Sequence, residues 1–399
     1  MKSVSLGMAT KAVVTYFAPC DPRQGMGGGA RLNLMLRALE SMSLETYLFS
    51  YDGSGTLALS RETLSPKTRI FKISVPRGVP KAIKLMTVTS LVFASLALSR
   101  RPSIVVAHSP GIASGLIGLV VSRLTRASFL VDHMDSRDPD TPEPLYRLVL
   151  RSADVVFAIS HRLEKEALEI GARKIVYLPI FLDLDRFPKG KTDRSAVRSY
   201  LNIGEEDFMV GYFGSFSRLE GLPVLLEAFS NLCTDMPEAK LLIVGARNVE
   251  GADDVELIVR RRGLGKNVIL LGPQPYARVP SLMQAADVLV APKIRAPENE
   301  MANPIKIYEY LASEIPCITS MVGEASELVR ETEAAFVVEP DDPEALERAI
   351  RFALKNRAAA ITVAKKGRAL AEQRHSLGIA SCMIRSTLSA LRHPDQDGR

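Results

Sequence analysis

The chain has 399 residues, of which 47% are hydrophobic and 24% are charged. This composition excludes an intrinsically disordered protein, and the length favours two domains over one. Lysine and arginine exceed aspartate and glutamate by 51 − 45 = 6, which suits phosphate-bearing partners, whereas the absence of tryptophan and of basic runs interleaved with aromatic residues argues against nucleic acid.

The first predicted element is a strand over residues 12–17, and the segment before it lacks the long apolar core and cleavage site of a signal peptide. Gly27, Gly28 and Gly29 separate this strand from a helix predicted over 30–41. Glycines at such a junction let backbone amides approach a phosphate or a sugar. The alternative is a plain flexible turn, because the spacing is not G-x-G-x-x-G.

Short β-branched runs then alternate with helical patterns, which predicts βαβ units and a mostly parallel sheet. The remaining strands of this first series are predicted over 46–49, 69–75, 104–107, 128–132, 154–159 and 174–178. Residues 85–99 are apolar or small, flanked by basic residues, and too few to span a bilayer. They suit either shallow insertion into an anionic membrane surface or burial against the sheet.

A segment with two prolines and a glycine, residues 179–190, is the predicted domain boundary. The expected domains are 1–185, joined by a terminal helix over 377–399, and 190–376. Strands of the second domain are predicted over 208–213, 240–244, 268–271, 288–290, 317–319 and 335–338, with helices in every gap. Three helices follow, over 343–354, 357–373 and 377–391. The expected fold is therefore α/β, with two Rossmann-like domains and a last helix that returns to the first domain.

Phosphate chemistry is predicted where the strand over 288–290 ends, since Lys293 follows it and a helix begins near Asn303. Asn303 is the expected N-cap and Pro304 the expected first helical residue. Lys306 then falls in the first turn, where a cation opposes the helix dipole unless it meets a phosphate. Glu309 lies near the same end and can accept hydrogen bonds from ribose hydroxyls.

The run that carries these residues, N-P-I-K-I-Y-E-Y-L-A-S-E-I-P-C-I over 303–318, resembles the P-x-K-x-x-E-Y-x-A-x-x-x-P signature of retaining family 4 glycosyltransferases (glycosyl transferases group 1). Residues 211–229, 241–245 and 286–292 are similar to that family in order and spacing. The resemblance implies a GT-B fold, whose parallel sheets face each other across a cleft. It also implies retaining, metal-independent transfer from a nucleotide diphosphate sugar, a UDP- or GDP-sugar, with no other cofactor.

Site residues follow from the same resemblance. It implies that the second domain holds the donor through Gly214, Ser215, Lys293, Glu300, Met301, Asn303, Pro304, Ile305, Lys306 and Glu309. Met301 stands where the family usually has a first glutamate, so neighbouring Glu298 and Glu300 are both candidates for the sugar contact. The family's diphosphate-clamping arginine and lysine are replaced by Ser215 and Glu220, which leaves Arg218 as the expected substitute. If Arg218 does not reach the diphosphate, Lys306, Lys293 or Arg295 must supply the charge.

In the first domain, His133 follows a predicted strand, and the resemblance implies that it lines the donor sugar. With Lys306 and Glu309 it completes the expected catalytic set. His108 and Ser109 beside Asp132 form a nucleophilic site only if their geometry allows it. The spacing of cysteine, histidine and acidic residues predicts no metal site.

The expected acceptor is a lipid-linked molecule or a polysaccharide, with peripheral contact to the membrane through residues 85–99. The four cysteines lie far apart and lack C-x-x-C spacing, which favours a cytoplasmic location, with peripheral contact at the inner face of the cell membrane. Two other functions stay open: a non-catalytic member that binds nucleotide sugar or a partner subunit, and a nucleotide-sugar epimerase on the same fold.

Overall fold

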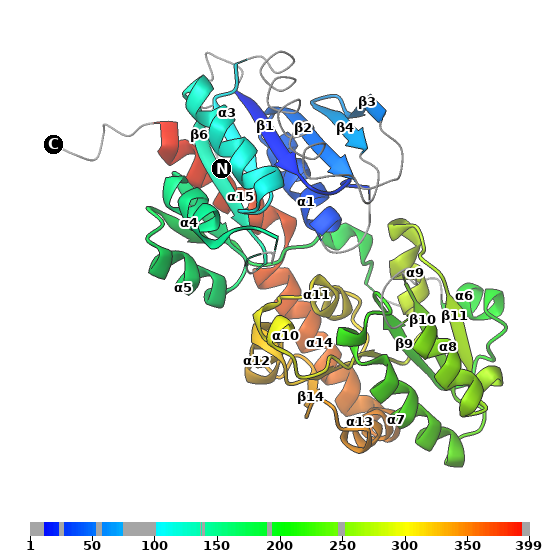
Figure 1. Ribbon diagram of the computed structural model, residues 1–399. Coiled ribbons are helices and arrows are strands. Elements are labelled where there is room, and N and C mark those ends of the chain that lie inside the picture. Colours follow the sequence, from blue (N-terminus) through cyan, green and yellow to red (C-terminus); the bar gives the residue numbers. More distant parts are fainter. Residues whose placement is uncertain are drawn as a thin grey trace. The chain divides into compact units, whose positions relative to one another are not determined.

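The computed structural model describes residues 12–23, 28–52, 58–74, 101–135, 137, 140–189, 194–245 and 252–392. These residues form two compact α/β units (Figure 1). The first unit contains the described residues up to Pro179 and those from Gly378 onward, and the second runs from Ile180 to Leu377. The division therefore falls at the start of the proline-containing segment 179–190. The apolar stretch 85–99 and Gly27 lie outside the described residues.

The elements of the first unit follow one another along the chain. They are β1 (Val13–Ala18), α1 (Gly28–Ser41), β2 (Glu45–Asp52), β3 (Ala58–Ser65), β4 (Thr68–Ser74), β5 (Ile104–Ala107), the π-helix η1 (Ile112–Leu116), α3 (Ile117–Thr125), β6 (Ser128–His133), α4 (Glu143–Ser152), β7 (Val155–Ala158), α5 (His161–Ile170), β8 (Ile175–Tyr177) and, at the end of the chain, α15 (Leu377–Arg392). Each strand predicted in this half is present, with ends shifted by no more than a few residues.

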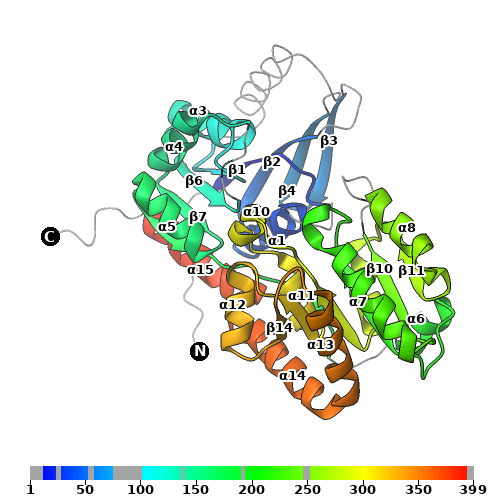
Figure 2. The ribbon, with the colours of Figure 1, turned by 60° about the horizontal axis from the view of Figure 1, so that its bottom comes forward.

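The described strands of the first unit form one sheet in the order β3-β4-β2-β1-β5-β6-β7-β8. All neighbours are parallel except β3 and β4, which pair antiparallel at the edge that Figure 2 shows. The predicted alternation of strand and helix fails here, because β4 follows β3 after a two-residue turn and without a helix. The sequence of β3 lacks a β-branched apolar run, since it is a half-exposed edge strand whose outward residues include Arg61 and Thr63.

The core of the first unit lies between this sheet and the helices α3, α4 and α5. Phe17, Phe49 and Val105 from the sheet pack with Val149 of α4 and Ala167 of α5, and all five are buried. Parallel strands covered on both faces need continuous apolar runs, which β1, β5 and β7 provide.

The second unit contains a longer series of elements. They are η2 (Leu184–Arg186), α6 (Arg194–Tyr200), β9 (Met209–Phe213), η3 (Arg218–Glu220), α7 (Leu222–Asp235), β10 (Lys240–Val244), α8 (Ala252–Arg261), η4 (Leu264–Lys266), β11 (Val268–Leu271), η5 (Tyr276–Arg278), α9 (Val279–Gln284), β12 (Val288–Ala291), α10 (Pro297–Met301), α11 (Ile305–Ala312), β13 (Cys317–Ser320), α12 (Gly323–Glu331), β14 (Phe336–Val338), α13 (Pro343–Lys355) and α14 (Arg357–Arg374). The predicted strands and terminal helices of this half are confirmed.

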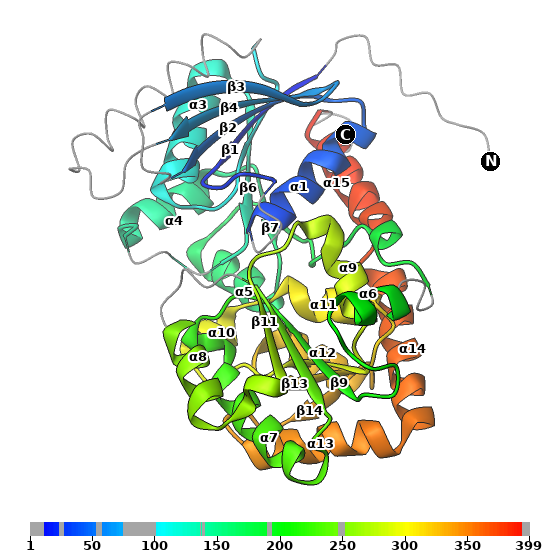
Figure 3. The same ribbon diagram turned by 90° about the vertical axis from the view of Figure 1, so that its right-hand side faces the viewer.

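The second sheet is wholly parallel among the described residues, in the order β11-β10-β9-β12-β13-β14. Leu225 of α7, Val255 of α8 and Leu346 of α13 pack with the buried faces of β9, β10 and β12. Figure 3 shows α8 on one side of this sheet and α14 on the other. Two α/β units with mostly parallel sheets and helices on both faces confirm the predicted fold class.

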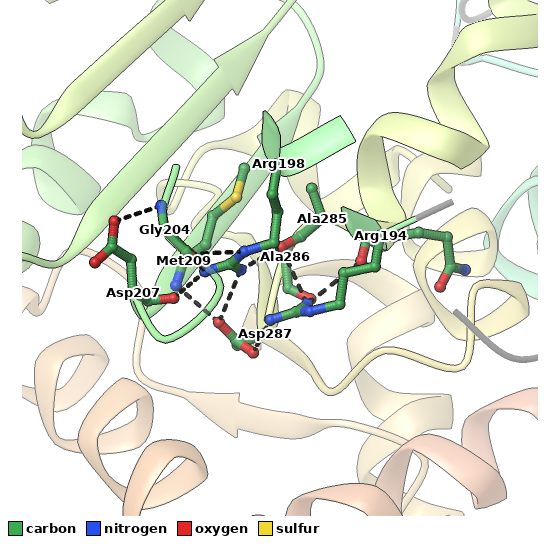
Figure 4. A network of polar contacts seen from close by, with 9 residues as sticks. Arg194, Arg198, Gly204, Asp207, Met209, Ala285, Ala286 and Asp287 are labelled. Carbon is green, nitrogen blue, oxygen red and sulfur yellow. Dashed lines mark hydrogen bonds and ion pairs between the residues drawn. The ribbon is translucent and has the colours of Figure 1, made fainter. Parts of the chain in front are cut away.

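A network of arginines holds the amino ends of β9 and β12 (Figure 4). Arg198 on α6 is fully buried and donates to the backbone oxygens of Gly204, Asp207 and Ala285. Arg194 pairs with Asp287 at 2.7 Å, and the other oxygen of that carboxylate accepts from the Met209 amide at 2.9 Å. This network ties α6 to the start of the sheet, at the edge opposite the loops described next.

Candidate functional site

The candidate site of the second unit lies at the carboxyl ends of β9 and β12. These strands are neighbours, yet the chain continues from β9 toward β10 and from β12 toward β13, on opposite sides. Such a reversal opens a crevice outside the carboxyl ends of the strands, where α/β proteins bind ligands. The loop after β9, the loop after β12 and the start of α11 meet there.

The loop after β9 approaches the start of α11 closely at Gly214. A Cβ on Gly214 would lie 2.6 Å from the Lys306 amino nitrogen and 2.7 Å from the Tyr212 hydroxyl. Only glycine therefore lets the Lys306 ammonium group come this near the loop backbone. The Tyr212 hydroxyl donates to the carbonyl of Ser215 at 2.6 Å, which fixes the turn that follows.

Three charged side chains form the centre of the site: Lys306, Lys293 and Glu220. The Lys306 ammonium group donates to the Glu220 carboxylate, and Lys293 lies 3.5 Å from the same carboxylate. Their side chains are only 11%, 8% and 13% exposed, respectively. Burial would raise the pKa of Glu220, but the two lysines outweigh it and lower that pKa.

The backbone around Glu220 is tightly fixed. Gly221 has φ +68°, and a Cβ there would lie 1.7 Å from the Pro292 carbonyl oxygen. The buried Asn299 amide donates to the carbonyls of Leu219 and Ile294, each at 2.8 Å. The same amide accepts from Lys293 at 2.8 Å, so α10 joins the loops that carry Glu220 and Lys293.

Glu309 lies one turn beyond Lys306 on α11. Its carboxyl group accepts a hydrogen bond of 2.5 Å from the Tyr276 hydroxyl, and the Arg186 guanidinium lies 5.0 Å from the centre of the Tyr276 ring. Burial raises the pKa of Glu309 to about 7, against the hydrogen bond from Tyr276 and the charges of Lys306 and Arg186. A carboxyl group that titrates near neutrality is typical of a functional site.

The start of α11 differs from the prediction. The helix begins at Ile305 with Pro304 in the cap position, so the prediction of Asn303 as N-cap and Pro304 as first helical residue is wrong. The Asn303 amide oxygen instead accepts from the Tyr308 hydroxyl at 2.8 Å. Pro304 has φ −75° and ψ 123°, an extended conformation that a helical residue cannot adopt.

Three other donor residues predicted in the second unit lie on α10 and on the turn that carries Glu220. Glu300 accepts from the backbone amide of Gly323 at 3.3 Å, and Met301 is the last residue of α10. Arg218 shares the turn with Glu220, but its exposed guanidinium lies 3.6 Å from Asp254 of α8. Sequence patterns do not indicate three further partners of the site, since each contact is made only through folding: Tyr212, Tyr276 and Asn299.

In the first unit, His133 ends β6 and is fully buried. Its Nε2 lies 3.3 Å from the Glu166 carboxylate and 3.2 Å from the Tyr146 hydroxyl, which itself donates to Glu166 at 2.9 Å. A carboxylate partner assigns the proton of a neutral ring to Nε2 and leaves a lone pair on Nδ1. Within the part of the chain that the structure describes, Nδ1 has no hydrogen-bond partner.

His108 and Asp132 do meet, 3.4 Å apart, but Ser109 does not join them, because its hydroxyl contacts Ser114. The Asp132 carboxylate is held by the buried guanidinium of Arg31 at 2.7 Å. Burial would lower the pKa of His108, yet the hydrogen bond with Asp132 raises it to about 9. His108 Nε2 lies 3.0 Å from the carbonyl oxygen of Gly28, so this cluster anchors the start of α1 and is not a serine nucleophile.

Two family models match the chain in consecutive stretches. "Glycosyl transferase 4-like domain" matches residues 26–180, and "Glycosyl transferases group 1" matches residues 193–370. The chain belongs to the group 1 glycosyltransferases. The resemblance seen in the run over 303–318 is thereby confirmed.

Curated relatives of this glycosyltransferase chain are distant. It is 26% identical over 225 residues to a D-inositol 3-phosphate glycosyltransferase of Segniliparus rotundus, covering 54% of this chain and 48% of the relative. It is 27% identical over 205 residues to the putative teichuronic acid biosynthesis glycosyltransferase TuaC of Bacillus subtilis, covering 51% and 48%. The chain thus spans about half the length of these relatives.

Solved glycosyltransferase structures share the fold over nearly the whole chain. Sucrose-phosphate synthase from Thermosynechococcus elongatus gives a TM-score of 0.78 at 19% identity, covering 97% of this chain and all of that one. Anabaena Alr3699/HepE in complex with UDP and glucose gives 0.75 at 17% identity, covering 96% and 100%. At such identities the likeness supports the GT-B fold and does not extend to substrates.

Two properties of the described part of this glycosyltransferase concern metals and membranes. It contains no group of three or more histidine, cysteine, aspartate or glutamate side chains placed to hold a metal ion. None of its helices combines the length and the apolar character that crossing a bilayer requires.

Proposed function

We propose that this protein transfers a hexose or an N-acetylhexosamine from a UDP- or GDP-sugar, with retention at the anomeric carbon and without a metal ion. The observation that carries the proposal is the pair of buried lysines, Lys306 and Lys293, at the topological switch point of the second sheet. Support also comes from the family, and from the Anabaena neighbour, which was solved in complex with UDP and glucose.

In this proposal the two lysines bind the diphosphate, together with the backbone of Gly214 and Ser215 and the N-terminus of α11. Charge on the leaving diphosphate grows as the sugar–phosphate bond breaks. Preorganised donors stabilise that charge, and each donor lost from such a site costs roughly 3 kcal/mol. Glu309 accepts hydrogen bonds from the ribose hydroxyls, a role that its position one turn along α11 supports.

His133 contacts the donor sugar in this proposal. The unpartnered lone pair of its Nδ1 supports the role, because a buried polar atom without a partner is rare in proteins. With its proton on Nε2, held by Glu166, the ring accepts a hydrogen bond from a sugar hydroxyl.

The proposed acceptor is a lipid-linked molecule or a glycan, with peripheral contact to the inner face of the cell membrane through residues 85–99. The name of the Bacillus subtilis relative refers to teichuronic acid biosynthesis and supports a glycan acceptor. The other named relative acts on an inositol phosphate, so an acceptor screen includes that class as well.

The test is the double variant Lys306→Met/Glu309→Gln, assayed by nucleotide release from UDP- and GDP-sugars with membrane lipid extract or glycan as acceptor. We expect kcat/KM to fall by at least about a hundredfold, because the variant loses both the lysine proposed to bind the phosphates and the carboxylate proposed to accept hydrogen bonds from the ribose. Lys266→Met, at an exposed position of the same unit, is the matched control and keeps the parent rate. Unchanged transfer by the double variant would remove the basis of the proposal.

A second candidate is a non-catalytic member that binds nucleotide sugar. It is favoured by one observation: Glu220 stands where the family has a cation and engages both lysines. The same assay separates the two functions, since the non-catalytic protein is stabilised by a nucleotide sugar but releases no nucleotide with any acceptor.

A further inference from the structure

Glu220 gives the candidate site an unusual charge balance. Two ammonium groups and one carboxylate leave a net charge of only +1 at the place where a diphosphate is proposed to bind. The carboxylate engages the Lys306 ammonium directly and lies 3.5 Å from Lys293. The Glu220 carboxylate is therefore already paired with the two ammonium groups that a phosphate would have to bind.

The lysines have contacts that persist without Glu220. Lys293 donates to Asn299 at 2.8 Å. The Lys306 ammonium lies 4.8 Å from the centre of the Tyr212 ring and 3.3 Å from its hydroxyl. Both cations thus keep their positions when the carboxylate turns away, whereas the backbone of Glu220 is fixed by Gly221 against Pro292. Exchange at this site requires a rotation of one glutamate side chain and no movement of a loop.

We propose that the Glu220 carboxylate competes with a diphosphate for the ammonium groups of Lys306 and Lys293. The carboxylate binds both lysines in the free protein, gives way when a diphosphate binds, and pairs with them again as the nucleoside diphosphate leaves. This inference rests on the proposed function, since it assigns regulation to the same site. The ligand class is a diphosphate, either free or esterified. The competition lowers affinity for the diphosphate and favours release of the product.

A purely structural role for Glu220 leads to a different outcome. If Glu220 serves only folding, neutralising it leaves two uncompensated buried cations and a less stable protein. Affinity for a diphosphate does not then increase. A competitor, when neutralised, frees those cations for a diphosphate. Coulombic attraction between charges near a protein surface is strong enough for such a gain, on the order of kilocalories per mole at contact distance.

Inorganic pyrophosphate is the probe, because it tests the cations without a base or a sugar. Isothermal titration calorimetry on the full chain is expected to give a Kd for Glu220→Gln that is at least tenfold lower than that of the parent, equivalent to about 1.4 kcal/mol. The matched control is Glu227→Gln, which neutralises a half-exposed carboxylate 3.3 Å from Arg262 on the same unit and leaves the Kd unchanged.

Two further variants keep the inference falsifiable. Glu220→Asp withdraws the carboxylate by one carbon and is expected to bind pyrophosphate with intermediate affinity, even if Glu220→Gln does not fold. Adding Lys306→Met to Glu220→Gln is expected to abolish the gain, because the freed cation is then absent. A Kd for Glu220→Gln or Glu220→Asp equal to or weaker than that of the parent overturns the inference.

Failure of this inference and failure of the proposed function give different results. If pyrophosphate binding tightens as expected but no sugar is transferred, the proposed competition by Glu220 is supported and the proposed transferase function is wrong. If sugar is transferred while the glutamate variants bind pyrophosphate no better than the parent, the transferase stands and the competitor is wrong. Absence of pyrophosphate binding in every variant also overturns the competitor.

Discussion

The two edges of the second sheet both carry buried cations, but they use them differently. At the amino edge, Arg194 and Arg198 direct planar guanidinium groups at backbone carbonyls, which cannot leave (Figure 4). At the carboxyl edge, Lys306 and Lys293 share one carboxylate side chain, that of Glu220, which we propose turns away when a diphosphate binds. A guanidinium suits fixed, multidentate contacts, whereas an ammonium is a point charge that readily changes partner. The comparison sets a structural cluster against a proposed binding one.

The largest effect is expected from Arg198→Met. The substitution removes the buried donor of the Gly204 and Asp207 carbonyls, leaves the Ala285 carbonyl with Arg194 as its remaining side-chain donor, and leaves Asp287 with one cation fewer. Losing one partner of a buried charged network costs about 3–5 kcal/mol, so we expect the free energy of unfolding to fall by that amount. Urea denaturation followed by circular dichroism measures it.

The control for this prediction is Arg260→Met. Arg260 is 81% exposed and lies 3.8 Å from Glu256 on the same helix, so its loss is expected to change stability by less than about 0.5 kcal/mol. The folded fraction of Arg198→Met should bind pyrophosphate like the parent. A variant that is stable but loses pyrophosphate binding would mean that the amino-edge cluster also serves the ligand.

At the carboxyl edge, the free energy of unfolding is expected to change with pH by roughly 3 kcal/mol. The pKa of Glu309 is raised to about 7 in the folded protein from a usual value of 4.5, so the folded state binds the extra proton between these values. Its contribution to the free energy of unfolding is therefore greatest below about pH 4.5. That contribution is lost as the pH rises to about 7, at roughly 1.4 kcal/mol for each pH unit between the two values.

Glu309→Gln removes this titration. Urea denaturation at pH 5 and pH 8 is expected to show a smaller loss of stability with rising pH in the variant than in the parent. Glu227→Gln, a half-exposed carboxylate of the same unit, should keep the parent's pH dependence. Identical slopes in the parent and Glu309→Gln would show that Glu309 titrates at its ordinary pKa and that burial at this edge is weaker than described.

Sequence patterns predict most of the fold, because buried parallel strands such as β5, β9 and β12 are continuous apolar runs. The half-exposed edge strand β3 has no such run and escapes prediction. The predicted helix start near Asn303 is wrong by one residue, since capping preferences cannot tell which of two neighbouring residues turns extended.

The candidate site can be located from sequence, but its internal pairing cannot. The motif over 303–318 predicts Lys306 and Glu309 on the same face of one helix, because residues three apart are neighbours on a helix surface. The partner of Lys306 is 86 residues away in sequence, and Tyr276 is 33 residues from Glu309. Only the sheet order brings those loops together. The role of Gly27 and the membrane contact of 85–99 remain predictions.

The smallest effect is expected from Gly214→Ala, and it sharpens the comparison most. The new methyl group would lie 2.6 Å from the Lys306 ammonium, the far end of a flexible side chain, and 2.7 Å from the hydroxyl of the buried Tyr212, so both side chains must shift. The Lys306 ammonium is then misplaced, so we expect pyrophosphate affinity to fall about tenfold, roughly 1.4 kcal/mol, with a smaller loss of stability than in Arg198→Met. Gly272→Ala is the matched control, because a Cβ at Gly272 meets no atom within 4 Å. If both variants bind pyrophosphate equally well, the close approach of Gly214 to Lys306 serves packing alone, and the two edges of the sheet would no longer differ in kind.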